Sequence, residues 1–301
     1  MSNINEKKDQ ENLYIIISNS LQNDFLEQLQ FDPSQFDPWK VGYEDCRDKW
    51  IPYFKENELP KGEKDITDFI NELRKIENPH PNDLEISYHE YIKKLKHRVH
   101  IGIDQSKRLW TDNRLGKFIH DLMETARIAN DPEIPENNHR YYFIHLRDWH
   151  DPSHQAEREE LSNYGYHCIK GSHGAEFIKP LSDYVHKHPY DTFTQVINSN
   201  SLSSFTETKL DFILDSIIKN HDSSTEKAII GVFGVVTDVK LKLLTFELKV
   251  VHNFKQVYLC EDLSAGFSQH GQDEGIDYMR YNLGVNILKE KPFREIFNIK
   301  Q

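Results

Sequence analysis

The chain of 301 residues has few cysteines, no long apolar run and no excess of positive charge. Its three cysteines, Cys46, Cys168 and Cys260, cannot all pair in a disulfide framework. This small, odd number of cysteines indicates a protein whose thiols are kept reduced. No apolar run reaches the length needed to span a bilayer. The first twelve residues, MSNINEKKDQEN, are polar and lack the apolar core of a signal peptide. We therefore expect a cytoplasmic protein that does not bind a membrane.

The charge balance argues against nucleic-acid binding. The formal net charge is −12, which disfavours a general binder of phosphate backbones. A basic stretch, KKLKHRVH, occurs at residues 93–100, but it is predicted to be the solvated face of a helix. The mean hydropathy is −0.71, and the length allows one large domain or two small ones.

Apolar, β-branched runs alternate with segments of helical periodicity. Strands are predicted at 13–20, 140–148, 193–198, 228–236, 256–260 and 284–288. Helices are predicted at 114–129, 205–220, 238–252 and 272–282. The third of these helices is apolar nearly all round, so we expect it to be largely buried. Strands that alternate with helices indicate an α/β fold with a mostly parallel sheet and helices on both faces.

One region breaks this alternation. Residues 30–112 contain two Asp-Pro steps and two helical patterns, DITDFINELRKI and SYHEYIKKLKHRV, separated by a proline-containing joint. We predict a single domain over residues 13–290, interrupted by a helical insertion at 30–112, after a polar N-terminal tail at 1–12. The insertion is a candidate surface for a partner or for regulation.

A cluster of possible metal ligands follows the second strand. Asp148 and His150 lie two residues apart in the extended stretch RDWHDPSH, so their side chains point to the same side. His154 follows after a turn, and His167 lies further on in GYHCIKGSHGAEF. One aspartate with two or three imidazoles suits Zn, Fe or Mn. The alternative is a set of surface histidines, because the chain has 16 of them.

The stretch VVTDVK places Lys240 at the start of the helix predicted at 238–252. A helix N-terminus stabilises anions such as a thiolate, and it disfavours a cation. Lys240 therefore needs an anionic partner or loses its proton, and Asp24 and Asp238 are the candidate partners. The alternative is a side chain that points to solvent or makes a purely structural ion pair.

Four segments, in the right order, resemble the isochorismatase-like cysteine hydrolases and, within them, the nicotinamidase branch. LYIIISNSLQNDF resembles the first strand and the D-x-Q-N-D-F turn, and RDWHDPSH followed by YHCIKGSHGAEF resembles the metal loop. GVFGVVTDVK resembles G-V-x-T-D-x-C, and LCEDLSAGF resembles the strand and turn after it. The resemblance covers roughly residues 13–28 and 114–290, and the insertion has no counterpart. It implies a doubly wound α/β fold.

The resemblance also implies a chemistry. Nicotinamidases hydrolyse an amide to an acid and ammonia: an Asp deprotonates a Cys, a Lys assists, and the thiolate attacks the carbonyl. Backbone amides beside the Cys, usually after a cis peptide, hold the oxyanion, and a metal orients the ring of the substrate. Matched residue by residue, the metal ligands are Asp148, His150 and His167, with His154 as a further candidate. Phe25 and Tyr164 match the aromatic wall of the pocket.

The three reacting residues are not kept. Ser20 stands at the place of the Asp, Ser199 at that of the Lys and Lys240 at that of the Cys. Because a thioester mechanism needs a thiolate, the route of the family is closed to this chain. Cys168 matches the metal loop, where it is a ligand or a small buried residue, and Cys260 is predicted to lie in the core.

Three hypotheses for the function follow. The first is a pseudoenzyme that keeps the metal and a pocket for a small aromatic or carboxylate ligand, with Lys240 as a positive charge. The alternative is a hydrolase of non-peptide amide bonds that uses Lys240, Ser199 and Ser20, or a metal-activated water. The third is an interaction protein with an empty metal site. The resemblance also makes self-association an expectation.

Overall fold

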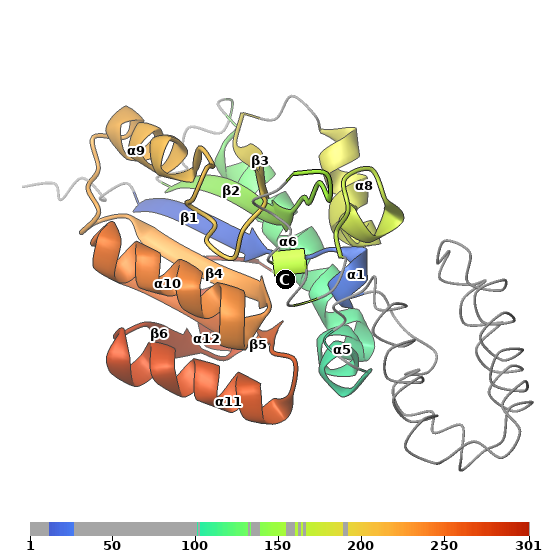
Figure 1. The fold of residues 1–301 in the computed structure, drawn as a ribbon. Helices are drawn as coiled ribbons and strands as arrows, with labels where there is room; N and C mark the ends of the chain where they lie inside the picture. The colour runs from blue at the N-terminus through green and yellow to red at the C-terminus, as the bar shows by residue number, and fades with distance from the viewer. Residues whose placement is uncertain are drawn as a thin grey trace, which may run out of the picture.

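The computed structural model describes a six-stranded sheet between two layers of helices (Figure 1). The described residues are 12–26, 101, 103–131, 133, 139–154, 160–161, 164, 167–188 and 192–300. The strands are β1 (Asn12–Asn19), β2 (His139–Asp148), β3 (Thr194–Ser199), β4 (Ile229–Val235), β5 (Gln256–Ala265) and β6 (Asn286–Leu288). All neighbouring pairs are parallel, in the order β3-β2-β1-β4-β5-β6. The predicted α/β class with a parallel sheet is confirmed.

Helices cover both faces of this sheet, as expected for a doubly wound fold (Figure 1). On one face pack α6 (Arg114–Ala129) and α12 (Glu290–Ile296). On the other pack α9 (Leu210–Asn220) and two longer helices. The first of these consists of η5 (Thr237–Leu241), α10 (Lys242–Phe246) and η6 (Glu247–Val251), and the second of α11 (Gln269–Asp277) and η7 (Tyr278–Asn282).

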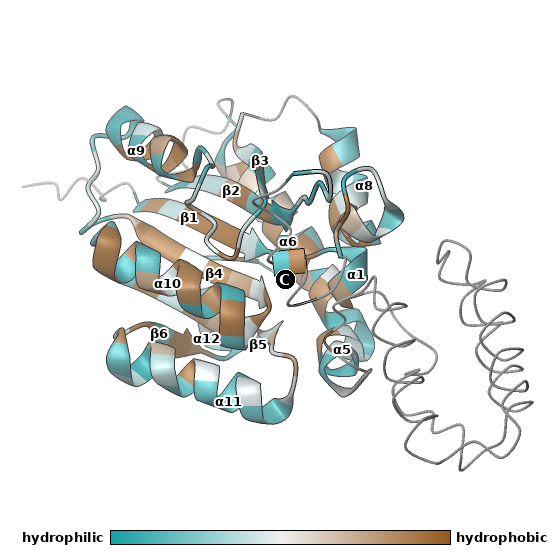
Figure 2. Cartoon of the chain, viewed as in Figure 1, coloured by the Kyte–Doolittle hydropathy of each residue, from teal (hydrophilic) through white to brown (hydrophobic). Residues whose placement is uncertain are grey.

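The central strands are apolar on both sides, because each face of the sheet is covered (Figure 2). In β1, Leu13, Ile15 and Ile17 point into the core beneath α9 and α10, and Tyr14 and Ile16 point into the core beneath α6. These alternating directions explain why the strand appears in the sequence as one continuous apolar run.

The remaining described elements are α1 (Asn23–Leu26), α5 (Ile103–Trp110), η2 (Thr111–Asn113), η4 (His173–Ala175) and α8 (Lys179–Lys187). Most of the predicted insertion at 30–112 and of the tail at 1–12 lies outside the described residues, but α5 and η2 belong to its end. Leu109 is fully buried, and Trp110 Nε1 donates a hydrogen bond of 2.8 Å to the Leu26 carbonyl. The predicted domain end at 290 falls at the start of α12, where Phe293 is fully buried in the core.

The helix predicted at 238–252 is less buried than its apolar sequence indicated. Leu241, Leu244 and Leu248 are fully buried, but Val250 and Val251 are 56% and 62% exposed. A helix on the outer face of a sheet is covered on one side only, whatever residues occupy its other side. None of the helices in the described ranges combines the length and the apolar character that crossing a bilayer requires.

One buried histidine lies within the sheet. His145 on β2 is 2% exposed, and its Nδ1 lies 2.7 Å from Ser18 Oγ on β1. Burial lowers the pKa of His145 to about 3, because the charged imidazolium loses its hydration. In the unfolded chain the pKa of a histidine is about 6.5.

We expect His145 to make the stability depend on pH. Its pKa is depressed in the folded state, so the stability it contributes is complete above pH 6.5 and is lost as the pH falls toward 3. Between pH 6.5 and 5 the free energy of unfolding should fall by about 2 kcal/mol from this residue. His145→Asn should remove that part of the pH slope in urea unfolding curves. His270→Asn, at a side chain that is 83% exposed, is the control, and equal slopes in both variants would contradict the prediction.

Candidate functional site

Four predicted site residues lie at the carboxyl edge of the sheet. Ser20 follows β1 directly, Asp148 ends β2, Ser199 ends β3, and Lys240 lies near the start of the helix after β4. Asp148 and Ser199 are also paired in register. The strand order reverses between β1 and β4, and ligand sites of parallel α/β sheets lie at such a switch point.

Lys240 is buried, with only 4% of its surface exposed, and its ammonium contacts the end of β2. Nζ donates to Asp148 Oδ1 at 2.6 Å and to the Ser201 carbonyl at 3.2 Å. It also lies 3.7 Å from Glu160 Oε1. The side chain therefore points into the site and pairs with the aspartate of the predicted metal loop.

The expected partners of Lys240, Asp24 and Asp238, were wrong, and so was a solvent-directed side chain. Asp24 Oδ2 accepts the backbone N–H of Cys168 at 2.7 Å, and Asp238 Oδ1 accepts that of Phe267 at 3.3 Å. Both aspartates hold loops in place. The partner was misidentified because it is Asp148, at the end of β2, and not the aspartate that follows β1 or the one that neighbours Lys240 in the helix.

The charges of the site stabilise one another. Burial alone would lower the pKa of Lys240, but the carboxylates of Asp148 and Glu160 outweigh burial and raise it. Burial alone would raise the pKa of Asp148, but the Lys240 ammonium and the nearby imidazoles hold it below its usual value. Burial raises the pKa of Glu160, and Lys240 offsets this only in part. Lys240 therefore keeps its proton and is not a free base.

The two serines meet Lys240 through shared acceptors. Ser20 Oγ donates to Asp148 Oδ1 at 3.3 Å, the oxygen that also binds Lys240. Ser199 Oγ donates to the Ser201 carbonyl at 3.0 Å, which accepts from Lys240 as well. The three positions thus converge, but each hydroxyl proton is directed at an oxygen and not at an amine that could remove it.

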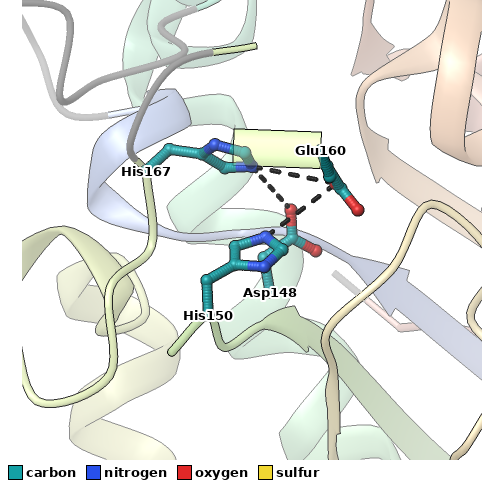
Figure 3. Close-up of side chains that lie close together, drawn as sticks. All are labelled: Asp148, His150, Glu160 and His167. Atoms are coloured by element: carbon teal, nitrogen blue, oxygen red, sulfur yellow. Dashed lines mark ion pairs between the residues drawn. The ribbon is translucent and has the colours of Figure 1, made fainter. Parts of the chain in front are cut away.

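Four side chains form a compact group of possible metal ligands: Asp148, His150, Glu160 and His167 (Figure 3). Their donor atoms lie within 4.8 Å of one another. His167 Nε2 is 3.6 Å from Asp148 Oδ2 and 4.0 Å from Glu160 Oε1, and His150 Nε2 is 3.9 Å from the same Glu160 oxygen. The side chains point toward one common space.

The chemistry of this group fits a divalent metal ion. With zinc–ligand bonds of about 2.0–2.1 Å, adjacent donors of a tetrahedral site lie about 3.4 Å apart, slightly closer than here. Asp148 Oδ2 and Glu160 Oε1 are buried and accept no hydrogen bond from the described residues, so the Lys240 ammonium leaves these two oxygens unsatisfied. Burial lowers the pKa of His150 to about 4, so its imidazole is neutral and can ligate at neutral pH.

Three of the predicted ligands, Asp148, His150 and His167, are thus brought together, and His154 is not. His154 is exposed, and its backbone N–H donates to the Asp151 carbonyl at 2.9 Å in a surface turn. Glu160 supplies the fourth donor, and no motif in the sequence singles it out. It is one of three glutamates in QAEREELSN, and only the folded loop places this one beside the histidines.

Of the two predicted pocket aromatics, Phe25 contacts a member of the donor group. Its ring is 1% exposed and meets the His167 ring edge-on, with centroids 5.7 Å apart. Tyr164 is half-buried in the segment between Glu160 and His167. Phe25 can therefore bound the space next to the donor group.

No thiol of the described residues stands at the helix start. Cys168 and Cys260 are fully buried, and burial raises the pKa of both thiols. The cis peptide that the resemblance implied is present between Val235 and Val236, just before the helix that carries Lys240.

The structure is similar in its α/β fold to solved nicotinamidases. One solved structure that it matches is the nicotinamidase/pyrazinamidase of Bacillus subtilis, with a TM-score of 0.54 and 12% identity, covering 92% of this chain and 99% of that one. Another is the pyrazinamidase/nicotinamidase of Streptococcus mutans, with a TM-score of 0.53 and 16% identity, covering 91% and 99%. No protein-family model matches the chain, and no curated protein matches it in sequence. At these identities the likeness is one of fold.

Proposed function

We propose that this chain is a catalytically degenerate relative of the nicotinamidase-like hydrolases, a pseudoenzyme that keeps a metal site for binding. The observation that carries the proposal is the Lys240 ammonium, 2.6 Å from Asp148 Oδ1 at the entrance of the helix after β4. An ammonium cannot form a thioester, and this one holds its proton through two carboxylates.

The neighbouring side chains also support the absence of a nucleophile at this site. A nucleophilic serine needs a base that accepts its proton. Ser20 donates to a carboxylate whose pKa is low, and Ser199 donates to a carbonyl, so neither has such a base. A serine–lysine mechanism would also require a neutral amine, and the raised pKa of Lys240 opposes it.

The metal in this proposal is Zn, Fe or Mn, held by Asp148, His150, Glu160 and His167. The small ligand beside it is aromatic and packs near Phe25. A carboxylate ligand is less well supported, because Lys240 already faces two carboxylates. Self-association stays a prediction.

A second candidate function, hydrolysis of a non-peptide amide by a metal-activated water, is supported by the same donor group. A bound divalent metal lowers the pKa of a coordinated water and supplies a hydroxide nucleophile. In this candidate the ligands are Asp148, His150 and His167, and Glu160, whose pKa burial raises, is the carboxyl group that accepts the proton.

Two measurements on the purified full chain test these functions. We expect near-stoichiometric zinc, iron or manganese by elemental analysis, and no ammonia released from nicotinamide or pyrazinamide above the buffer rate. Release that disappears in Lys240→Ala would overturn the pseudoenzyme proposal. Release that survives in Lys240→Ala but disappears in His150→Ala would favour the metal-activated water. Absence of metal would favour the empty-site hypothesis.

A further inference from the structure

The ammonium of Lys240 lies among the metal donors. Nζ is 2.6 Å from Asp148 Oδ1 and 3.7 Å from Glu160 Oε1, and both residues belong to the four-donor group. The side chains of Lys240, Asp148 and Glu160 are 5%, 3% and 9% exposed. Charges at these distances and with so little solvent interact far more strongly than on a surface.

Asp148 is shared between the ammonium and the imidazoles. Its Oδ1 accepts from Lys240, and its Oδ2 lies 3.6 Å from His167 Nε2. A metal bound through Oδ2 would therefore sit across one carboxylate from a fixed positive charge. Two carboxylates and one ammonium carry a net charge of −1, so a divalent ion leaves +1 buried, whereas without the ammonium the sum is zero.

The loop after β3 keeps the ammonium in place. The Ser201 carbonyl accepts from Lys240 Nζ at 3.2 Å and from Ser199 Oγ at 3.0 Å. Ser203 Oγ in turn donates to Glu247 Oε1 at 2.6 Å, on the same long helix as Lys240. Because these bonds tie the loop to both the strand and the helix, Lys240 cannot turn away without losing buried hydrogen bonds.

We propose that Lys240 is a built-in counter-cation that weakens divalent-metal binding at the group of Asp148, His150, Glu160 and His167. The inference rests on the proposed metal site and adds its regulation: the ammonium holds the metal affinity below the value that the four donors alone would give. The ammonium already neutralises one of the two carboxylates, so an incoming metal gains less attraction from them and meets repulsion from Lys240.

The test compares zinc affinities of full-length proteins by competition with a chromogenic chelator. We expect Lys240→Met and Lys240→Gln to bind Zn(II) at least about tenfold more tightly than the wild type. Lys242→Met, which removes the same charge from the same helix two residues further on, should leave the affinity unchanged. Thermal unfolding should show a larger zinc-dependent rise in Tm for the Lys240 variants than for the wild type.

The outcomes separate this inference from the proposed function. Equal or weaker zinc binding by folded Lys240 variants, with binding by the wild type intact, overturns the counter-cation and leaves the metal site standing. If neither the wild type nor any variant binds Zn(II) or Mn(II), the proposed metal site is wrong and the inference with it. Should Lys240→Met not fold, Lys240→Gln carries the test, since its amide can still donate to Asp148.

Discussion

Asp148→Asn is expected to lower the free energy of unfolding of the metal-free protein by about 3–5 kcal/mol. The substitution removes the charge that lies 2.6 Å from Lys240 Nζ, and it leaves an ammonium that is 95% buried by side-chain area with a weaker partner. A buried charge without its counter-ion is among the costliest defects in a folded chain. Urea unfolding at pH 7 with a chelator present measures the effect.

Two further variants identify the ion pair as the cause. Asp148→Asn combined with Lys240→Met should recover part of the loss, because the ammonium that lost its 2.6 Å partner is gone. The Glu160 carboxylate, 3.7 Å from that ammonium in the wild type, then lacks its cation, so recovery is incomplete. Asp183→Asn, at an exposed position on α8, should stay within about 0.5 kcal/mol of the wild type. A double variant no more stable than Asp148→Asn alone would show that the pair does not account for the loss.

His167→Ala is expected to weaken Zn(II) binding by at least about 100-fold, because it removes one of four donors from a buried site. Glu160→Gln should also weaken binding strongly, since the amide is neutral and a poorer ligand for the ion. Competition with a chromogenic chelator gives both affinities on the full chain.

The control for this result is His154→Ala. The sequence made His154 a candidate ligand, but the structure places it on the surface, so the variant should bind zinc like the wild type. A large loss in His154→Ala with none in Glu160→Gln would show that the metal uses the loop in a different arrangement from the one described.

Local patterns located the long elements well. The helix predicted at 114–129 coincides with α6, and the strand predicted at 140–148 lies within β2. Both have a periodicity that is set by burial of one stripe or of alternate residues. The predicted element boundaries were less accurate where tertiary packing sets the end of a strand or stabilises a short helix. For example, β5 continues to Ala265 through the charged stretch EDLSA, and α12 was missed because it is short.

The site residues likewise fall into those that spacing in the sequence predicted and those that only packing decided. Asp148 and His150 could be grouped from sequence because they are two residues apart in an extended chain, and spacing alone puts them on one side. Glu160 could not be found, because the sequence around it has no pattern that identifies one glutamate among three. The partner of Lys240 was misassigned for a related reason: Asp148 ends β2, which is not adjacent to β4 in the sheet, and only the buried lysine side chain reaches it across the end of β1.

By itself, the sequence determined the α/β class, three of the four possible metal ligands and the presence of a lysine at the start of the helix after β4. These features depend on the periodicity and the order of residues along the chain, because burial of one face of each helix or strand sets a local sequence pattern. Only the tertiary structure decided that Lys240 is buried against Asp148, that Glu160 joins the donors and that His154 does not. Those outcomes depend on which strand ends meet at the edge of the sheet. Charges interact over a few ångströms in space, and the number of residues between two positions in the sequence does not predict that distance.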